Sequence, residues 1–129
     1  TLSEGKKNGV PEENINKEKQ VGKRQRESFS AAVKAGVKIV LGTDAGIYPH
    51  GDNAKQLARM VQFGMTPLQA IQSATINSAE LLRWQDKVGQ LKSGFYADII
   101  AVDQNPLTNI STLESVTFVM KNGDVYKHQ

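Results

Sequence analysis

A short apolar run between a helical pattern and a glycine-rich turn places the strongest constraint on the fold. The run is Val37–Leu41 (VKIVL), and Gly-Thr-Asp-Ala-Gly follows it at residues 42–46. A helix is predicted before it, from about Glu13 to Ala35, because apolar residues recur there at spacings of three and four. That face carries Phe29, Ala32, Val33 and finally Gly36. A helix leading directly into a short β-branched strand is typical of an α/β protein with a buried parallel sheet.

Three short helices are expected after the turn, because each has its own start signal. The signals are Asp52–Asn53, Thr66–Gln69 and Asn77–Glu80, and the first helix ends at Gly64. Thr66–Gln69 (TPLQ) has Thr at the N-cap, Pro at the first helical position and Gln at N3, which is a capping box. Asn77 with Glu80 repeats the same device.

After Trp84 the apolar pattern changes from helical to strand-like. The predicted strands are Val88–Lys92, Ala97–Asp103, Val116–Lys121 and Asp124–Lys127. Asn122-Gly123 predicts a tight hairpin, because both central positions of a type I′ turn need positive φ. A sheet of so few strands has exposed edges and is expected to need more sheet to pair with.

Composition excludes several classes of protein. The chain has 129 residues, 39% of them hydrophobic, and a formal net charge of +3. These values predict one domain with its own core and exclude a wholly disordered chain. A bilayer-spanning helix needs about 20 mostly apolar residues, and no such run exists, so no membrane association is expected. The absence of cysteine excludes disulfides and thiolate metal sites.

The basic residues are concentrated near the start of the chain. Residues 1–38 contain 9 Lys and Arg against 5 Asp and Glu, with the excess in Lys17–Arg26. Glu18 interrupts that segment, and no aromatic side chain lies within it to stack on bases. We interpret it as a solvated helix face and expect no nucleic-acid partner.

Asp44 is the first candidate for chemistry. It follows the end of the predicted strand, where α/β folds gather ligands and catalytic groups. A carboxylate there can ligate a metal ion or take a proton from a metal-bound water. The alternative is that Asp44 only caps a turn formed by Thr43 and Gly46.

The same loop offers two further candidates. His50 and Asp52 follow Asp44 by six and eight residues, so the three side chains could together ligate zinc. Tyr48 could line a pocket beside them. The alternatives are a surface role for His50 and a packing role for Tyr48.

Several motifs resemble a known family through their joint order. They are Val37–Gly46 (VKIVLGTDAG), His50–Asn53 (HGDN), Gly64–Ala70 (GMTPLQA), Ala74–Ala79 (ATINSA), Gly89–Ile100 (GQLKSGFYADII), Asn105–Leu107 (NPL) and Val119–Val125 (VMKNGDV). The succession resembles the C-terminal part of a metal-dependent amidohydrolase, in the branch of Xaa-Pro dipeptidases (prolidase-like) and imidazolonepropionase-like enzymes.

The resemblance implies a fold and two domains. Residues 1–85 would be the C-terminal portion of a (β/α)₈ TIM-like barrel, with Val37–Leu41 as its eighth strand. Residues 86–129 would be the C-terminal portion of a composite β-sandwich. A complete barrel takes roughly 250 residues, so the chain is expected to be a fragment of an α/β enzyme.

The resemblance also implies a metal site. In the family, one or two zinc ions are held by a His-x-His, often a carboxylated Lys, two further His and an Asp after the eighth strand. Only that Asp has a match here, as Asp44, which is both metal ligand and general base in these enzymes. The HGDN loop resembles the stretch that faces the substrate, which makes His50 and Tyr48 candidate substrate-binding residues. Most of the metal would be held by residues outside this chain.

The expected function is part of a zinc-dependent hydrolase that cleaves an amide bond in a dipeptide, Xaa-Pro or related, or in an N-acyl amino acid. We expect the isolated chain to be inactive and to expose apolar surface meant for the remainder of the barrel, which favours self-association. The alternative is a non-catalytic α/β interaction module that needs a partner chain.

Overall fold

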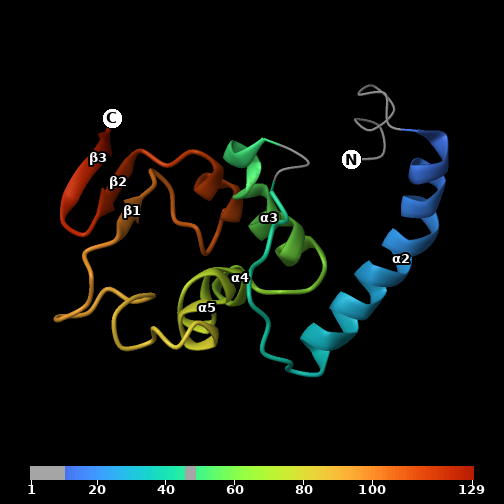
Figure 1. The fold of residues 1–129 in the computed structure, drawn as a ribbon, viewed down its shortest axis with the longest axis horizontal. Coiled ribbons are helices and arrows are strands. Elements are labelled where there is room, and N and C mark those ends of the chain that lie inside the picture. The colour runs from blue at the N-terminus through green and yellow to red at the C-terminus, as the bar shows by residue number, and fades with distance from the viewer. Residues whose placement is uncertain (1–10, 46–48) are drawn as a thin grey trace. The chain divides into compact units, whose positions relative to one another are not determined.

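The computed structural model describes residues 11–45 and 49–129, without the side chains of residues 18 and 20 (Figure 1). The chain divides into two compact units, Thr1–Val37 and Lys38–Gln129, and each is described by itself. The second unit contains both helices and strands: the helices come first and a small antiparallel sheet follows.

The first unit contains helix α2, Glu12–Lys34, which agrees with the predicted helix to within one residue at each end. A Schellman motif ends it. The Gly36 N–H donates to the Val33 carbonyl oxygen at 3.0 Å, and the Val37 N–H donates to that of Ala32 at 3.1 Å. Gly36 has φ 71°, a conformation that glycine adopts without the steric cost of a Cβ.

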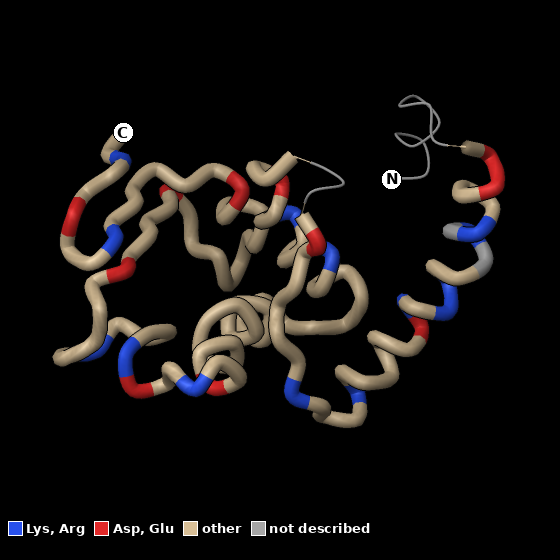
Figure 2. The backbone as a smooth tube through the Cα atoms, viewed as in Figure 1, with Lys and Arg blue, Asp and Glu red and all other residues tan. Residues whose placement is uncertain are grey.

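The basic segment lies on this helix, as predicted. Figure 2 shows Lys and Arg spread along α2 with acidic positions between them. Lys23 and Glu27 approach to 3.8 Å, and both side chains are mostly exposed. A surface pair of this kind contributes little to stability.

Three helices open the second unit: α3 Lys55–Gln62, α4 Pro67–Ala74 and α5 Ile76–Leu81. The capping box of α4 is confirmed. The Gln69 N–H donates to the Thr66 hydroxyl at 3.2 Å, and the Thr66 N–H donates to the Gln69 side-chain oxygen at 2.8 Å. Gly64, with φ 118°, follows the end of α3 as predicted.

The other two start signals are wrong. Helix α3 begins after Ala54 with no side-chain cap, and Asp52 instead forms an ion pair with Lys55 at 2.9 Å. Helix α5 begins after Thr75, also without a side-chain cap, so Asn77 lies inside the helix. The side chains of Asn77 and Glu80 bind another part of the chain, described below.

The sheet has the order β1-β2-β3 and is antiparallel throughout. Its strands are β1 Ile99–Ala101, β2 Phe118–Lys121 and β3 Asp124–His128, with the short 3₁₀ helix Ile110–Glu114 before β2. The predicted hairpin is confirmed, because Asn122 and Gly123 both have positive φ, 52° and 91°.

Two predicted strands are absent from these described residues. Val37–Leu41 is not a strand, because its backbone bonds to helices and not to a neighbouring strand: Val37 bonds to α2, Leu41 to α4 and Ile39 to α5. Val88–Lys92 is a bent loop. Gly89 has φ 88° there and lies against α5: a Cβ at this residue would be 3.0 Å from the Ala79 Cβ and from the Thr75 carbonyl oxygen.

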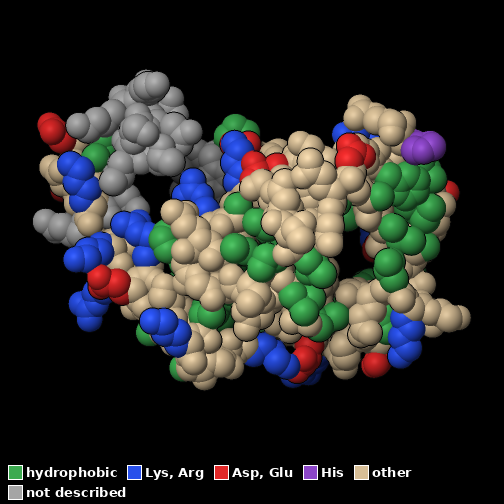
Figure 3. Space-filling view, turned by 180° about the vertical axis from the view of Figure 1, so that it is seen from behind, with side chains coloured by type: hydrophobic (Ala, Val, Ile, Leu, Met, Phe, Trp, Pro, Cys, Tyr) green, Lys and Arg blue, Asp and Glu red, His purple; other side chains and the backbone are tan. Residues whose placement is uncertain are grey.

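The core of the second unit lies among its helices. Its buried side chains are Leu57, Met60, Met65, Ala70, Ser73 and Ala79. Several large apolar residues are exposed, among them Leu81 at 66%, Leu82 at 69% and Tyr126 at 72% (Figure 3). No helix in the described part of the chain is long and apolar enough to cross a membrane.

Candidate functional site

Asp44 lies in the second unit, three residues after Leu41, with its side chain exposed. Its φ is 49°, in the left-handed region that non-glycine residues rarely adopt and that Asp tolerates better than most. Backbone strain of this kind is concentrated at functional sites, where the surrounding structure maintains it. An exposed carboxylate held in such a turn is available to a ligand.

The segment before Asp44 is held by α4 and α5. The Leu41 N–H donates to the Ser73 carbonyl oxygen at 3.0 Å. The Asn77 side-chain amide donates to the Ile39 carbonyl oxygen at 3.0 Å. Lys38 forms an ion pair with Glu80 at 2.7 Å.

Sequence reasoning missed the roles of Asn77 and Glu80, because their spacing matched a capping box. The signal that could have found them is their position. Asn77 follows Thr75 and Ile76 and falls inside the first turn of α5 if Thr75 is the N-cap, which leaves its side chain available for a distant partner.

His50 and Asp52, two of the three other predicted site residues, do not form a metal-ligating cluster with Asp44 among the described residues. His50 is exposed and begins the short 3₁₀ helix His50–Asp52. The carboxylate of Asp52 is paired with Lys55. Tyr48 lies outside the described residues.

The described residues do not by themselves fit a zinc ion. Within 11–45 and 49–129 there is no group of three His, Cys, Asp or Glu side chains that could hold a metal. Asp44 offers one oxygen ligand of a type that zinc accepts. Any further ligands would have to come from outside these residues.

A buried polar atom lies close to this loop in the sequence. The Asn53 side-chain oxygen is buried and has no hydrogen-bond partner in the described structure. Because an unsatisfied buried acceptor costs free energy, a hydrogen-bond donor that reached this oxygen would stabilise the structure.

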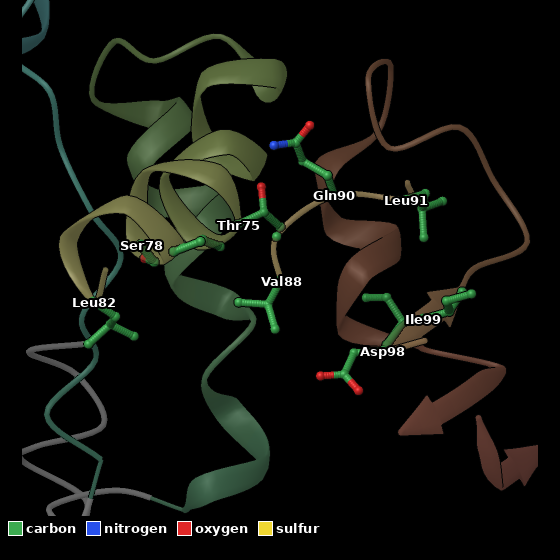
Figure 4. A pocket seen from close by; sticks show the side chains of 12 residues that line it. Thr75, Ser78, Leu82, Val88, Gln90, Leu91, Asp98 and Ile99 are labelled. Atoms are coloured by element: carbon green, nitrogen blue, oxygen red, sulfur yellow. The ribbon is translucent and has the colours of Figure 1, made fainter. Parts of the chain in front are cut away.

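A pocket of about 460 Å³ lies elsewhere in the second unit, and Figure 4 shows its lining. Thr75, Ser78 and Leu82 line one side, and Leu91 and Ile99 line the other. Two of its hydroxyls are already engaged: those of Thr75 and Ser78 donate to the carbonyl oxygens of Ile71 and Ser73 in α4. The pocket contains neither Asp44 nor His50, so we do not assign the chemistry to it.

Asp98 also borders this pocket, and each of its carboxylate oxygens accepts a hydrogen bond. It accepts from the Lys121 ammonium at 2.6 Å and from the Asn122 N–H at 2.8 Å. These two bonds, that of Lys121 first, hold the pKa of Asp98 below its ordinary value. The carboxylate fastens the hairpin turn to the start of β1 and is structural.

The sequence model of the amidohydrolase family matches residues 1–126, and the chain belongs to that family. It is similar to an ochratoxinase of Aspergillus niger, with 42% identity over 106 residues. That match covers 78% of this chain and 22% of the ochratoxinase.

Solved structures extend the likeness to nearly the whole chain. A Xaa-Pro dipeptidase with methionine bound in its active site matches with a TM-score of 0.87 at 44% identity, over 98% of this chain and 32% of that one. A prolidase in complex with N-methylphosphonate-L-proline matches with a TM-score of 0.84 at 29% identity, over 99% of this chain and 32% of that one. The chain therefore spans about a third of these structures and about a fifth of the ochratoxinase.

Proposed function

We propose that this chain contributes Asp44 to the active site of a metal-dependent amidohydrolase that cleaves an amide bond in a dipeptide or an N-acyl amino acid. The observation that carries the proposal is the turn at Asp44, an exposed carboxylate with φ 49° that follows a segment held by α4 and α5. Membership of the amidohydrolase family supports the reaction class. The similarity to a Xaa-Pro dipeptidase and a prolidase supports a peptide substrate.

In this proposal Asp44 transfers a proton. Its carboxylate accepts a proton from the attacking water and returns it to the leaving nitrogen, so the same group is first base and then acid. It would also be one of the ligands of a zinc ion, which lowers the pKa of water and polarises the scissile carbonyl. His50 and Tyr48 are proposed to face the substrate.

The test is Asp44→Asn in the enzyme expressed from the complete reading frame that contains this chain. Asn fits a left-handed backbone as well as Asp does but cannot take the proton. We expect kcat to fall by roughly 10²–10⁴-fold, the usual contribution of a general acid–base group, with the circular dichroism spectrum unchanged. Asp86→Asn, at an exposed position outside the loop, is the matched control and should leave kcat unchanged.

A second function, a non-catalytic docking module, is favoured by the exposed side chains of Leu81, Leu82 and Trp84, which lie close together in the sequence. The same experiment separates the two. If Asp44→Asn leaves the rate unchanged in a folded protein, the catalytic role is wrong and docking becomes the better proposal.

A further inference from the structure

At the junction between α4 and α5, the Ser73 carbonyl oxygen accepts hydrogen bonds from outside the regular helical pattern. Thr75, between the two helices, has φ −122° and ψ −94°, which interrupts the helical backbone. In a continuous α-helix the Ser73 carbonyl would accept the N–H of residue 77. Here it accepts from the Leu41 N–H at 3.0 Å and from the Ser78 hydroxyl at 2.7 Å.

Two side chains further along α5 continue the attachment. Asn77 donates to the Ile39 carbonyl oxygen at 3.0 Å, and Glu80 pairs with Lys38 at 2.7 Å. Asn77 and Glu80 are three residues apart within α5, so their side chains lie on one face of that helix. The Ser73 carbonyl, Asn77 and Glu80 bind Leu41, Ile39 and Lys38 respectively, so consecutive parts of the segment are attached to consecutive parts of the helix pair.

The three attachments differ in strength. The side chains of Lys38 and Glu80 are each 58% exposed, and an exposed ion pair contributes little. The bond between Leu41 and Ser73 joins two backbone groups. Asn77 is half-buried and supplies the one attachment that is made by a partly buried side chain, so its loss should cost more than that of the exposed ion pair.

The segment ends close to Asp44. Only Gly42 and Thr43 separate Leu41 from Asp44, so a shift of the segment relative to α5 is transmitted to the carboxylate. A displacement of about 1 Å can cost about 100-fold in rate when a reacting group must be aligned.

We infer that Asn77 is a positioning residue for Asp44: its amide fixes the segment Lys38–Leu41 against α5 and thereby sets where the Asp44 carboxylate stands. The inference rests on the proposed function. It assigns Asn77 no contact with substrate or metal.

The test compares variants of Asn77 in the enzyme expressed from the complete reading frame. Asn77→Asp keeps the shape of the side chain but replaces the amide donor by an acceptor that repels the Ile39 carbonyl. Asn77→Gln keeps the donor on a longer arm. The matched control is Asn109→Asp, since the Asn109 side-chain amide donates to the exposed Gln104 side-chain oxygen, at 2.6 Å.

The expected result is a split between kcat and KM. Asn77→Asp should lower kcat by roughly 10- to 100-fold, the range found when a residue that orients a ligand is lost, and change KM by less than about 3-fold. Asn77→Gln should recover part of kcat, and Asn109→Asp should resemble the unchanged enzyme. Amide hydrogen exchange should become faster at Leu41 in Asn77→Asp while the amide of Ala79, inside α5, keeps its protection.

Three outcomes overturn the inference: an unchanged kcat in folded Asn77→Asp, an equal loss in Asn109→Asp, or a loss that only follows the fraction of unfolded protein. If Asn77→Asp does not fold, Asn77→Ala, which removes the donor without adding a charge, is judged by the same criteria. Asp44→Asn is measured alongside. An active Asp44→Asn enzyme refutes the proposed function itself, whereas an inactive one with a normal Asn77→Asp refutes only the role of Asn77.

Discussion

The helices α3 to α5 and the sheet β1–β3 belong to the same unit but are stabilised in different ways. Among the described residues of the second unit, all the buried side chains lie between Leu57 and Ala79, in the helices and the turn between them. From residue 83 to the end of the chain, no residue is buried. The helices therefore have their own core. The sheet has no buried side chain of its own and is held together by backbone pairing.

This difference follows from the kind of interaction each region uses. A helix satisfies its backbone internally, so three short helices need only a shared apolar face. A strand needs neighbours on both edges and cover on its faces. Ile100, Val125 and Tyr126 of the sheet are more than half exposed, which is consistent with a surface that further parts of an amidohydrolase could cover.

The largest expected difference in stability between the two regions comes from replacing one methionine in each by alanine. Met60 is 3% exposed and its sulfur lies 3.9 Å from the Ser73 hydroxyl, whereas Met120 in β2 is half-buried. We expect Met60→Ala to reduce the free energy of unfolding by about 2–5 kcal/mol, as for other buried large-to-small changes. Met120→Ala should cost about 1 kcal/mol. Urea unfolding of the two variants measures the difference, and equal losses would show that the sheet has a core of its own.

The sequence predicted what local chemistry determines. The capping box at Thr66, the glycine that ends α2 and the Asn122-Gly123 turn are complete within a few residues, and all three are confirmed. The strands at 37–41 and 88–92 were wrong because a strand is defined by its partner, and an apolar run does not reveal whether one is present.

The candidate site was predictable only in part. Asp44 could be singled out from the glycine-rich turn after an apolar run, but its positive φ and the attachment of the preceding segment to α5 depend on contacts 38 residues away in sequence. For Asn77 and Glu80 a familiar local pattern gave the wrong interpretation, because the tertiary partners Ile39 and Lys38 took the side chains instead.

Gly89 tests how closely the loop before the sheet depends on the helices. Its φ is 88°, and a Cβ would lie 3.0 Å from both Ala79 and the Thr75 carbonyl oxygen. Gly94 has a similar φ, 86°, with nothing within 4 Å of such a Cβ. Both alanine variants carry the cost of a left-handed backbone, about 1–2 kcal/mol.

Gly89→Ala should reduce the free energy of unfolding by about 1–3 kcal/mol more than Gly94→Ala does, because the loop or α5 must move to admit the methyl group. Urea unfolding of Gly89→Ala and Gly94→Ala gives the difference directly. If the two variants are equally stable, the loop does not pack on α5 as tightly as the structure indicates, and the two regions are more independent than we describe.

The smallest expected effect lies within the sheet and depends on pH. The Lys121 ammonium and the Asn122 N–H hold the pKa of Asp98 below its ordinary value of 3.8. The ionised carboxylate therefore stabilises the folded hairpin fully only well above its ordinary pKa of 3.8, where it is also ionised in the unfolded chain. That contribution is lost as the pH falls below 4 and through the lower pKa of the folded state, because protonation removes the charge that both donors bind.

Hydrogen exchange of the Gly123 amide, which donates to the Ala97 carbonyl oxygen at 3.2 Å, should show opening of the hairpin in acid, after correction for the intrinsic exchange rate. In Asp98→Asn this dependence should disappear, while the amide of Ala79 in α5 should be indifferent to the substitution. If the acid-induced opening persists in Asp98→Asn, another group is responsible and the carboxylate does not fasten the turn.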